Sequence, residues 1–418
     1  MLTLTRFGMT MVAPAAMVIL LFGCTTPAVP DSDHAGARPD GRNGELVFLL
    51  NDTDQVRIPG HWSGDTLTVH NAQETLVLLP QGHGSWSIPV FDGTLSLVGD
   101  TGSWEDVLRP GDYRVPVRWE EGAPFQQGAT WSPDTLSWLL AFGEDDPWFG
   151  QLFIQQDGEA CQGSIATSTG DFRFLHGHLH ADGDFVLQTF DGAHLFRFSG
   201  TLNDKGDIEQ GLFLSGNHYS TSFTGQSIAP SESGLTDPPI AQWTGQPVAY
   251  TALDLSGDPV AWQASQAPGV HILSVMGSWC PNCMDEHRLL LDLIERHPEV
   301  HVHTLAFERG VDLDNPDSEA NSTAIERMKR YAEQMGMVRH ADRWHIRIAG
   351  PASKSKAQQT LPFLDQVVSF PTTVIVGVDG ASSTPWIHSG FNGPAMGPAH
   401  ELELARFEAA ISGSTGSR

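Results

Sequence analysis

The sequence feature that most constrains this chain is the run Val270 to Glu286, VHILSVMGSWCPNCMDE. Its first part, Val270 to Met276, has the short, mostly apolar and β-branched character of a buried parallel strand. A Gly-Ser pair then breaks the strand, and a Cys-x-x-Cys pair follows where a helix would begin. This arrangement predicts a strand, a tight turn and a helix that starts at the cysteine pair.

The two cysteines of this run are expected to have different roles. Pro281 would occupy the first helical position, where a missing N–H costs nothing. Cys280 would then face unpaired backbone N–H groups and the positive end of the helix dipole, which favour a thiolate and lower its pKa. We expect Cys280 to be the nucleophile, and Cys283, one turn later, to attack its sulfur and resolve a mixed disulfide.

Trp279, Cys280, Cys283 and Glu286 together match W-C-x-x-C-x-x-E after a strand. At these residues the chain resembles the TlpA/ResA-type thiol-disulfide oxidoreductases of the thioredoxin superfamily, the redoxin domains. The resemblance runs from about Trp243 to the C-terminus. One departure is the central dipeptide Pro281-Asn282, because many members carry proline second, and this dipeptide tunes the redox potential.

The same resemblance implies a cis-proline that faces the cysteine pair. The segment SFPTTVIVGVDG is similar to the strand that carries it, with Pro371 as the cis residue. A cis-proline exposes the backbone of the residue before it, here Phe370, so that an extended substrate can pair with it. We expect Trp279, Phe370 and Thr372 to contact the substrate. The alternative for Pro371 is an ordinary trans proline at the start of a strand.

Glu286 is a candidate for proton exchange with Cys283. The two residues share one apolar helical face with Leu290, Leu293 and Ile294. A carboxyl on that face would be buried below the cysteines, where desolvation raises its pKa. The alternative is an exposed glutamate on the helix surface.

The rest of the C-terminal part reads as alternating strands and helices. Val248 to Trp262 predicts a hairpin and Val300 to Phe307 a strand parallel to the first. Ser318 to Met335 predicts an inserted helix, and Pro398 to Ile411 the C-terminal helix. Thr372 to Val378 and Trp386 to Ser389 would pair around Asp379-Gly380.

The N-terminus resembles a bacterial lipoprotein signal. An apolar stretch ends in Leu-Phe-Gly-Cys at Cys24, too short and too early for a transmembrane span. We expect residues 1–23 to be a signal peptide, Cys24 to be lipidated, and 24–44, rich in Pro, Asp, Gly and Ser, to be a disordered tether. The protein would then be anchored in the cell envelope facing the periplasm, with the outer membrane favoured because Thr25 follows the cysteine. The alternative is an ordinary signal peptide.

The formal net charge of −27 argues against nucleic acid as a partner and against adhesion to an anionic bilayer. Once Cys24 and the redox pair are assigned, only Cys161 remains of the four cysteines. A single leftover cysteine is most often a buried, inert side chain. The sequence therefore predicts no lasting structural disulfide.

Residues 45–227 contain short apolar or alternating runs separated by Asp-Gly, Gly-Asp and Asn-Asp turns. A spacing of eight to twelve residues between candidate strands is typical of an antiparallel sandwich or barrel. Asp191-Gly192 is the clearest tight-turn signal. A break between two subdomains is expected near 120–147, and 228–245 should be a linker before the C-terminal domain, 246–418.

Three histidines of this region could carry chemistry. His176, His178 and His180 alternate, so on a strand they would share one face and could hold a transition metal. No cysteine or acidic cluster stands at ligand spacing beside them, and we favour a polar, solvent-facing strand.

The sequence thus predicts a multidomain chain: an all-β, sandwich- or barrel-like N-terminal region followed by an α/β thioredoxin-like domain. It would reduce protein disulfides with Cys280 and Cys283, need no metal or organic cofactor, and be recharged by an upstream thiol donor. Two alternatives stay open. One is a β-domain binding or scaffold lipoprotein with an accessory redox domain, and the other is a thioredoxin-fold peroxidase, although the proline and threonine expected before a peroxidatic cysteine are missing.

Overall fold

The computed structural model describes residues 41–109, 111, 113–122, 134–232, 235, 240–315, 318–377 and 384–415. The chain divides into two units, Met1–His34 and Ala35–Arg418, and the structure described below belongs to the second. The expected signal peptide, Cys24 and most of the expected tether lie outside the described residues, as does Asp379-Gly380.

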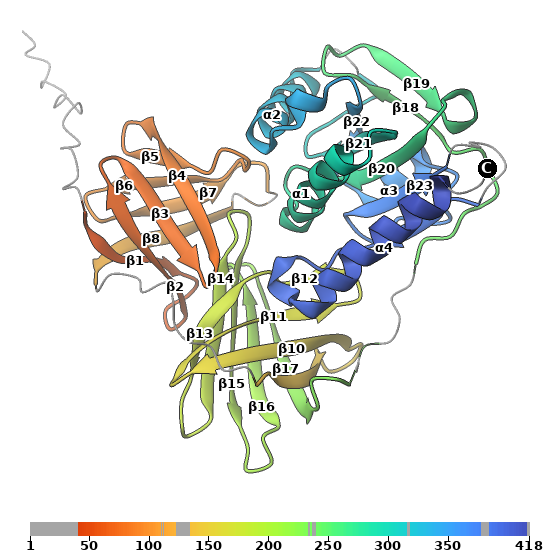
Figure 1. Ribbon diagram of the computed structural model, residues 1–418. Coiled ribbons are helices and arrows are strands. Elements are labelled where there is room, and N and C mark those ends of the chain that lie inside the picture. The colour runs from red at the N-terminus through yellow and green to blue at the C-terminus, as the bar shows by residue number, and fades with distance from the viewer. Residues whose placement is uncertain are drawn as a thin grey trace, which may run out of the picture. The chain divides into compact units, whose positions relative to one another are not determined.

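The first sheet is a closed barrel in which each strand is antiparallel to the next and β1 pairs with β8 (Figure 1). Its strands are β1 Asn43–Leu49, β2 Gln55–Ser63, β3 Thr66–Asn71, β4 Glu74–Gly82, β5 Ser85–Ser87, β6 Thr94–Val98, β7 Thr101–Asp106 and β8 Tyr113–Glu121. Every second residue of β2 is buried, as expected for a strand with one face on a core. Trp62 and Trp104 lie fully inside.

The second sheet has the strand order β10-β9-β17-β16-β15-β14-β13-β11-β12, and β10 also pairs with β11, which closes the sheet on itself. Its strands are β9 Leu136–Phe142, β10 Trp148–Asp157, β11 Ala160–Thr167, β12 Gly170–Asp171, β13 Leu175–Leu179, β14 Asp184–Phe190, β15 Leu195–Leu202, β16 Ile208–Ser215 and β17 Tyr219–Ile228. Phe142, Phe198 and Phe213 form the centre of its core.

The third sheet is mixed, in the order β19-β18-β22-β21-β20-β23-β24. Its strands are β18 Ala249–Leu253, β19 Pro259–Gln263, β20 Val270–Met276, β21 Val300–Glu308, β22 Trp344–Pro351, β23 Thr372–Val376 and β24 Trp386–Ser389. The neighbours β20, β21 and β22 are parallel, whereas β23 is antiparallel to β20.

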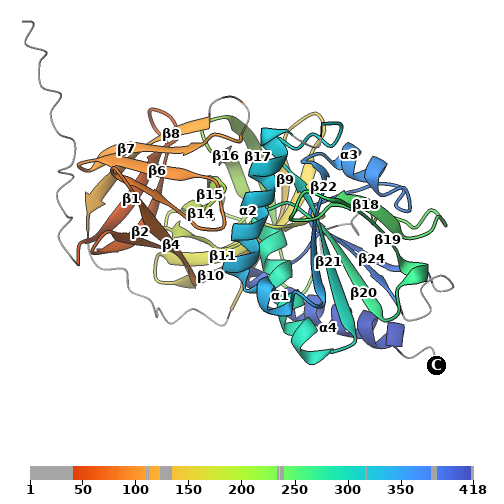
Figure 2. The same ribbon diagram turned by 90° about the horizontal axis from the view of Figure 1, so that it is seen from above.

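Helices cover both faces of this mixed sheet (Figure 2). The α-helices are α1 Pro281–Arg296, α2 Glu319–Met335, α3 Lys354–Thr360 and α4 Pro398–Thr415, and the short 3-10 turns are η1 Ala264–Gln266, η2 Met337–His340 and η3 Pro394–Met396. One core joins Ile272 of β20 to residues of α1, α2 and α4. The other joins Leu273 of the same strand to Ala357 of α3. All seven residues of β20 are buried because both faces are covered.

The coarse prediction of a largely β chain with several modules is confirmed. In the described residues up to Glu232 the structure has strands and no helix. The chain changes from the first sheet to the second between Glu121 and Leu136. The turn at Asp191-Gly192 joins β14 to β15, and the expected parallel pairing of β20 with β21 is present. The domain boundaries themselves stay predictions.

Two strands have a composition that does not predict a strand. β2 contains Pro59 and Gly60, which argue against a strand, yet Pro59 lies in register with Glu45 of β1 and Gly60 is paired with both β1 and β3. β17 is rich in Ser and Thr and has little apolar alternation. Both segments form strands because a closed sheet needs a hydrogen-bonding partner on each side of every strand. This requirement outweighs their weak strand propensity.

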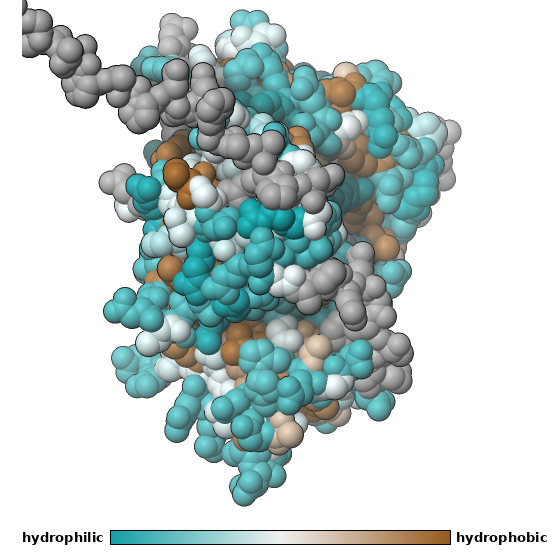
Figure 3. All heavy atoms as spheres, turned by 90° about the vertical axis from the view of Figure 1, so that its left-hand side faces the viewer, coloured by the Kyte–Doolittle hydropathy of each residue, from teal (hydrophilic) through white to brown (hydrophobic). Residues whose placement is uncertain are grey.

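The two β-sheets of the N-terminal region are joined by reciprocal hydrogen bonds. Asn71 of β3 donates to the carbonyl of Phe190 at 2.8 Å and accepts from its N–H at 3.0 Å. The Phe190 ring itself lies in the barrel core beside Phe48 and Trp104. The face shown in Figure 3 is mostly hydrophilic, with apolar residues in small separate patches.

Candidate active site

The turn before α1 is held by a buried carboxylate. The backbone N–H and the hydroxyl of Ser278 donate to the two oxygens of Glu308, at 2.7 and 2.8 Å. Glu308 is fully buried at the end of β21 and is paired with Arg327 of α2 at 2.9 Å. Both carboxylate oxygens of Glu308 accept hydrogen bonds and the charge is paired with Arg327, which offsets the cost of burying this carboxylate.

Trp279 packs tightly over the same turn. Its indole N–H donates to the carbonyl of Phe307 at 3.0 Å. A Cβ on Gly277 would lie 2.3 Å from that indole nitrogen, so the position requires glycine. The Trp279 ring meets Phe370 edge to face, with centroids 5.4 Å apart.

Cys280 and Cys283 form a disulfide at the N-terminus of α1, with their Cα atoms 5.3 Å apart. Cys280 is the N-cap residue, and its sulfur accepts the N–H of Cys283 at 3.2 Å. Pro281 occupies the first helical turn as expected. Cys280 is 7% exposed and Cys283 is fully buried, so of the two cysteines only the first reaches the surface.

The Phe370–Pro371 peptide bond is cis, and the Phe370 carbonyl oxygen lies 3.5 Å from the Cys280 sulfur. The structure therefore brings Trp279, Cys280, Phe370 and Pro371 together. Thr372 is different, because its side chain is fully buried and its hydroxyl donates to the Ser369 carbonyl at 2.8 Å. The Thr372 side chain therefore has no exposed surface that a substrate could contact.

Glu286 lies fully buried, one turn after Cys283 on α1. Its carboxyl accepts hydrogen bonds from Ser274 at 2.7 Å and from Thr373, which belong to β20 and β23. Burial raises the pKa of Glu286 to about 7, although the two hydrogen bonds oppose that rise. Its expected burial is confirmed, whereas its role in proton exchange stays a prediction.

A buried polar chain continues from Glu286. Ser274 also lies 3.2 Å from Nε2 of His287, and Nδ1 of His287 lies 3.0 Å from the Tyr331 hydroxyl. Burial lowers the pKa of His287 to about 3, which keeps the ring neutral. Sequence reasoning missed His287 and Tyr331, because nothing in their spacing shows that α1 and α2 face each other here.

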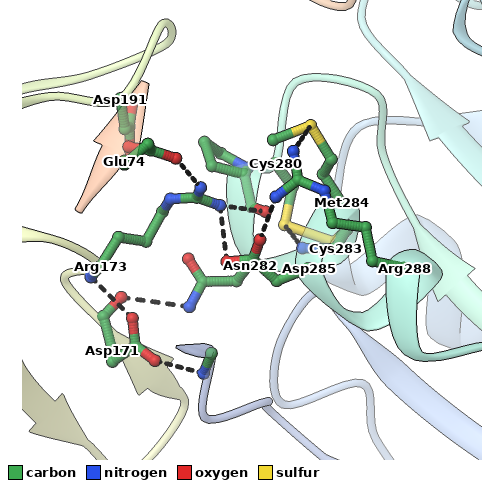
Figure 4. A network of polar contacts seen from close by, with 12 residues as sticks. Glu74, Asp171, Arg173, Asp191, Cys280, Asn282, Cys283, Met284, Asp285 and Arg288 are labelled. Carbon is green, nitrogen blue, oxygen red and sulfur yellow. Dashed lines mark hydrogen bonds and ion pairs between the residues drawn. A yellow bond between two sulfur atoms is a disulfide. The ribbon is translucent and has the colours of Figure 1, made fainter. Parts of the chain in front are cut away.

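A second set of residues that the sequence did not indicate holds the first turn of α1 from the side of the β-sheets (Figure 4). Arg173 is buried and forms ion pairs with Glu74 of β4 and, at 2.7 Å, with Asp285 of α1. It also donates to the Pro281 carbonyl at 2.7 Å. Although burial opposes its charge, the carboxylates of Asp285 and Glu74 hold the pKa of Arg173 above its ordinary value.

Asp171 completes this contact. Its carboxylate accepts the N–H groups of Arg173 and Gly393, and its carbonyl accepts the side-chain amide of Asn282 at 3.1 Å. Burial raises the pKa of Asp171 to about 6, and the nearby charge of Asp285 adds to that effect. Both residues between the two cysteines, Pro281 and Asn282, are therefore bonded to the nine-stranded sheet.

The remaining candidates lie elsewhere. Cys161 is buried with a free thiol in the core of the nine-stranded sheet, and burial raises its pKa to about 12. The rings of His178 and His180 lie 4.4 Å apart, and His180 is paired with Glu159 at 3.1 Å. Among the described residues, no group of three or more His, Cys, Asp or Glu is arranged to hold a metal ion.

No protein-family model and no curated protein matches the sequence. Solved structures that resemble part of the chain include thioredoxin-family thiol-disulfide oxidoreductases and a peroxiredoxin-like protein of Aquifex aeolicus. A thiol:disulfide interchange protein of Chlorobium tepidum is 13% identical over 43% of this chain and 99% of its own, with a TM-score of 0.27.

Two others are similar to about the same extent. A secreted disulfide oxidoreductase of Mycobacterium tuberculosis, homologous to E. coli DsbE, is 17% identical over 38% of this chain and 95% of its own, with a TM-score of 0.25. The thioredoxin domain of a thiol-disulfide oxidoreductase of Bacteroides vulgatus is 17% identical over 38% of this chain and 97% of its own, also at 0.25.

Proposed function

We propose that the protein is a thiol-disulfide oxidoreductase that reduces disulfide bonds in other proteins, with residues 246–418 forming a thioredoxin-like domain. The observation that carries this proposal is the pair Cys280 and Cys283 at the start of α1, of which only Cys280 keeps exposed surface. A two-step thiol-disulfide exchange requires one accessible and one buried cysteine. The accessible cysteine attacks the substrate disulfide, and the buried cysteine then resolves the mixed disulfide.

The reaction balances without a bound cofactor. The Cys280 thiolate attacks one sulfur of a substrate disulfide, which forms a mixed disulfide and releases the first substrate thiolate. The Cys283 thiolate then attacks the Cys280 sulfur, which closes the disulfide of the enzyme and releases the second substrate thiolate. Two protons are taken up by the substrate thiolates, and an external dithiol donor must reduce the enzyme again.

Glu286 is proposed to take up the proton that the buried Cys283 thiol gives up. Cys283 is fully enclosed, so its proton cannot pass directly to water. A carboxyl with a pKa of about 7 one turn away can exist in both protonation states at neutral pH. Ser274 and Thr373 position this carboxyl.

The test is reduction of a protein disulfide by the purified protein with dithiothreitol as the electron donor. We expect turnover by the wild type, loss of turnover in Cys280→Ser, and accumulation of mixed disulfides in Cys283→Ser. Cys161→Ser is the matched control and should behave as wild type, because Cys161 lies in a separate core. Wild-type protein that fails to accelerate the reduction would rule out the proposal.

We also propose that Cys24 carries a lipid anchor that holds the protein in the cell envelope. The support is the Leu-Phe-Gly-Cys sequence after an apolar stretch. Among the described residues, no helix is long and apolar enough to cross a membrane. Partner proteins with disulfides and a thiol donor would then be found in the same compartment.

A further inference from the structure

A cleft of about 480 Å³ opens beside Cys280, within the range of about 300–1,000 Å³ typical of ligand sites. One wall comes from the start of α1 and the turns beside it, and includes Trp279, Pro281, Asn282 and Phe370. The opposite wall comes from the nine-stranded sheet. Its aromatic members are Trp148, Phe149, Phe172 and Phe196.

We call these four aromatic side chains the aromatic wall; ring contacts join three of them, and Phe149 lines the same cleft. Phe172 meets Phe196 edge to face at 5.0 Å between centroids and stacks beside Trp148 at 6.4 Å. Phe149 is 49% exposed. Partly exposed aromatic rings gathered in one concave place offer apolar surface that a bound molecule can bury.

The aromatic wall is held at a fixed place relative to Cys280. β12 precedes Phe172 directly, and the Asp171 carbonyl accepts a hydrogen bond from Asn282. Arg173, the next residue after Phe172, donates to the Pro281 carbonyl from inside its buried ion pairs. Gly170 (φ 138°) approaches so closely that an added Cβ would lie 2.9 Å from the Asn282 amide.

Building on the redox function proposed above, we propose that the aromatic wall is part of the substrate site and selects polypeptide disulfides with apolar side chains next to the reacting cysteine. Cys280 lines the cleft, so an occupant that exchanges with it must present a sulfur there. Beside that sulfur it meets aromatic rings. A polar disulfide leaves these rings in water, whereas an apolar neighbour of the cysteine buries them.

The chemistry in the cleft is the exchange already described. The substrate disulfide is reduced to two thiols, the enzyme dithiol is oxidised to the Cys280–Cys283 disulfide, and an external dithiol restores it. The aromatic wall takes no part in electron transfer. It binds the side chains that flank the reacting sulfur and so contributes to KM and to selectivity.

The experiment compares two synthetic peptides that contain the same intramolecular disulfide. In one, Leu and Phe flank the cysteine, and in the other, two Ser residues do. Wild-type protein, kept reduced with dithiothreitol, should prefer the apolar peptide. In Phe149→Ala and in Phe196→Ala, the ratio of the two kcat/KM values should fall about tenfold, mainly through KM, which is the scale of one lost buried ring.

Tyr219→Ala is the matched control. Tyr219 is another exposed aromatic residue of the nine-stranded sheet, at 46% exposure, and it does not line the cleft. The ratio should remain at the wild-type value there. Far-UV circular dichroism and the melting temperature show whether each variant is folded.

Three results would overturn the proposal. The first is a wild-type ratio near one, and the second is an unchanged ratio in folded Phe149→Ala and Phe196→Ala. In both cases turnover of the peptides continues, so the redox function survives. The third is a wild type that reduces neither peptide nor the small neutral hydroxyethyl disulfide, which defeats the redox function and the cleft proposal together.

Discussion

Cys280 and Cys283 differ in surroundings although they are three residues apart. Cys280 caps α1, lines the cleft and is 7% exposed, whereas Cys283 is fully buried. A thiolate needs either solvent or fixed N–H donors, and the Cys280 sulfur accepts the N–H of Cys283. This asymmetry supports the assignment of nucleophile and resolving cysteine.

The first prediction concerns labelling of the reduced protein. Iodoacetamide should modify Cys280 rapidly at pH 7, below the ordinary thiol pKa of about 8.5, while Cys283 resists until the protein is unfolded. Cys161 is an internal control, because burial raises its pKa and it should also stay unlabelled in the native state. Peptide mapping by mass spectrometry measures all three. Equal native rates at Cys280 and Cys283 would contradict the assignment.

The second prediction concerns the pH dependence caused by Glu286. Its pKa rises from 4.5 in the unfolded chain to about 7 when folded, so the native state holds an extra proton between these values. Its carboxyl therefore makes the wild type less stable as pH rises from 4.5 to 7, by roughly 3 kcal/mol at most. Glu286→Gln has no titrating carboxyl at this position, so its free energy of unfolding should rise relative to that of the wild type between pH 4.5 and 7.

Urea unfolding at pH 4.5, 5.5 and 7 measures this difference, and the reduction rate against pH should lose an inflection near pH 7 in the variant. Parallel stability curves for the two proteins would mean that the carboxyl is not held protonated. An unaltered rate profile would remove Glu286 from the proposed proton exchange.

At the scale of elements, the first turn of α1 is the place where all three sheets meet. Just before it, Ser278 donates a hydrogen bond to Glu308 of β21. Arg173, between β12 and β13, bonds to Pro281 and pairs with Glu74 of β4, and Met284 packs into the barrel core. Most ion pairs on protein surfaces contribute little, but these charges are enclosed. Breaking one therefore leaves a buried charge without its partner.

The third prediction tests that enclosure. Arg173→Met should lower the free energy of unfolding by about 3–5 kcal/mol, because Glu74 and Asp285 lose their shared buried counter-ion. Arg288→Met is the matched control, since it removes a 53% exposed guanidinium from the same Asp285 and should cost about 1 kcal/mol or less. Urea unfolding followed by tryptophan fluorescence measures both. Equal losses would show that burial does not decide the effect.

At the scale of the whole molecule, the mixed sheet occupies only the C-terminal part of the chain, and seventeen strands precede it among the described residues. Asp171 of β12 and Arg173, which follows β12, are hydrogen-bonded to the two residues between Cys280 and Cys283. That contact favours a β-region that shapes substrate access over one that acts as a separate scaffold.

The fourth prediction concerns anchoring of the whole chain. Cys24→Ser should move the protein from the membrane pellet to the soluble fraction, because two or more acyl chains would be its strong attachment. Cys161→Ser is the control and should remain in the pellet, since that thiol is buried in a core. Immunoblots of fractionated cells measure this. A Cys24→Ser variant that stays in the pellet would refute the lipid anchor.

The sequence by itself determined the local features of the site. An apolar run, a Gly-Ser break and a cysteine before proline are enough to predict β20, its turn and the start of α1, because capping and strand burial depend on neighbours in the chain. The burial of Glu286 followed from helical periodicity in the same way.

The cleft and the ion pairs of Arg173 were decided only by the tertiary structure. Arg173 and Asp285 are separated by 112 positions, and Glu74 by another 99, so no periodicity relates them. From the sequence, Arg173 between two phenylalanines is predicted to be a surface residue of a strand. Only the packing of the two β-sheets against the N-terminus of α1 buries it. Long-range packing also formed the aromatic wall. Trp148 of β10, Phe196 of β15 and Phe172, directly after β12, come together only because these strands belong to one closed sheet.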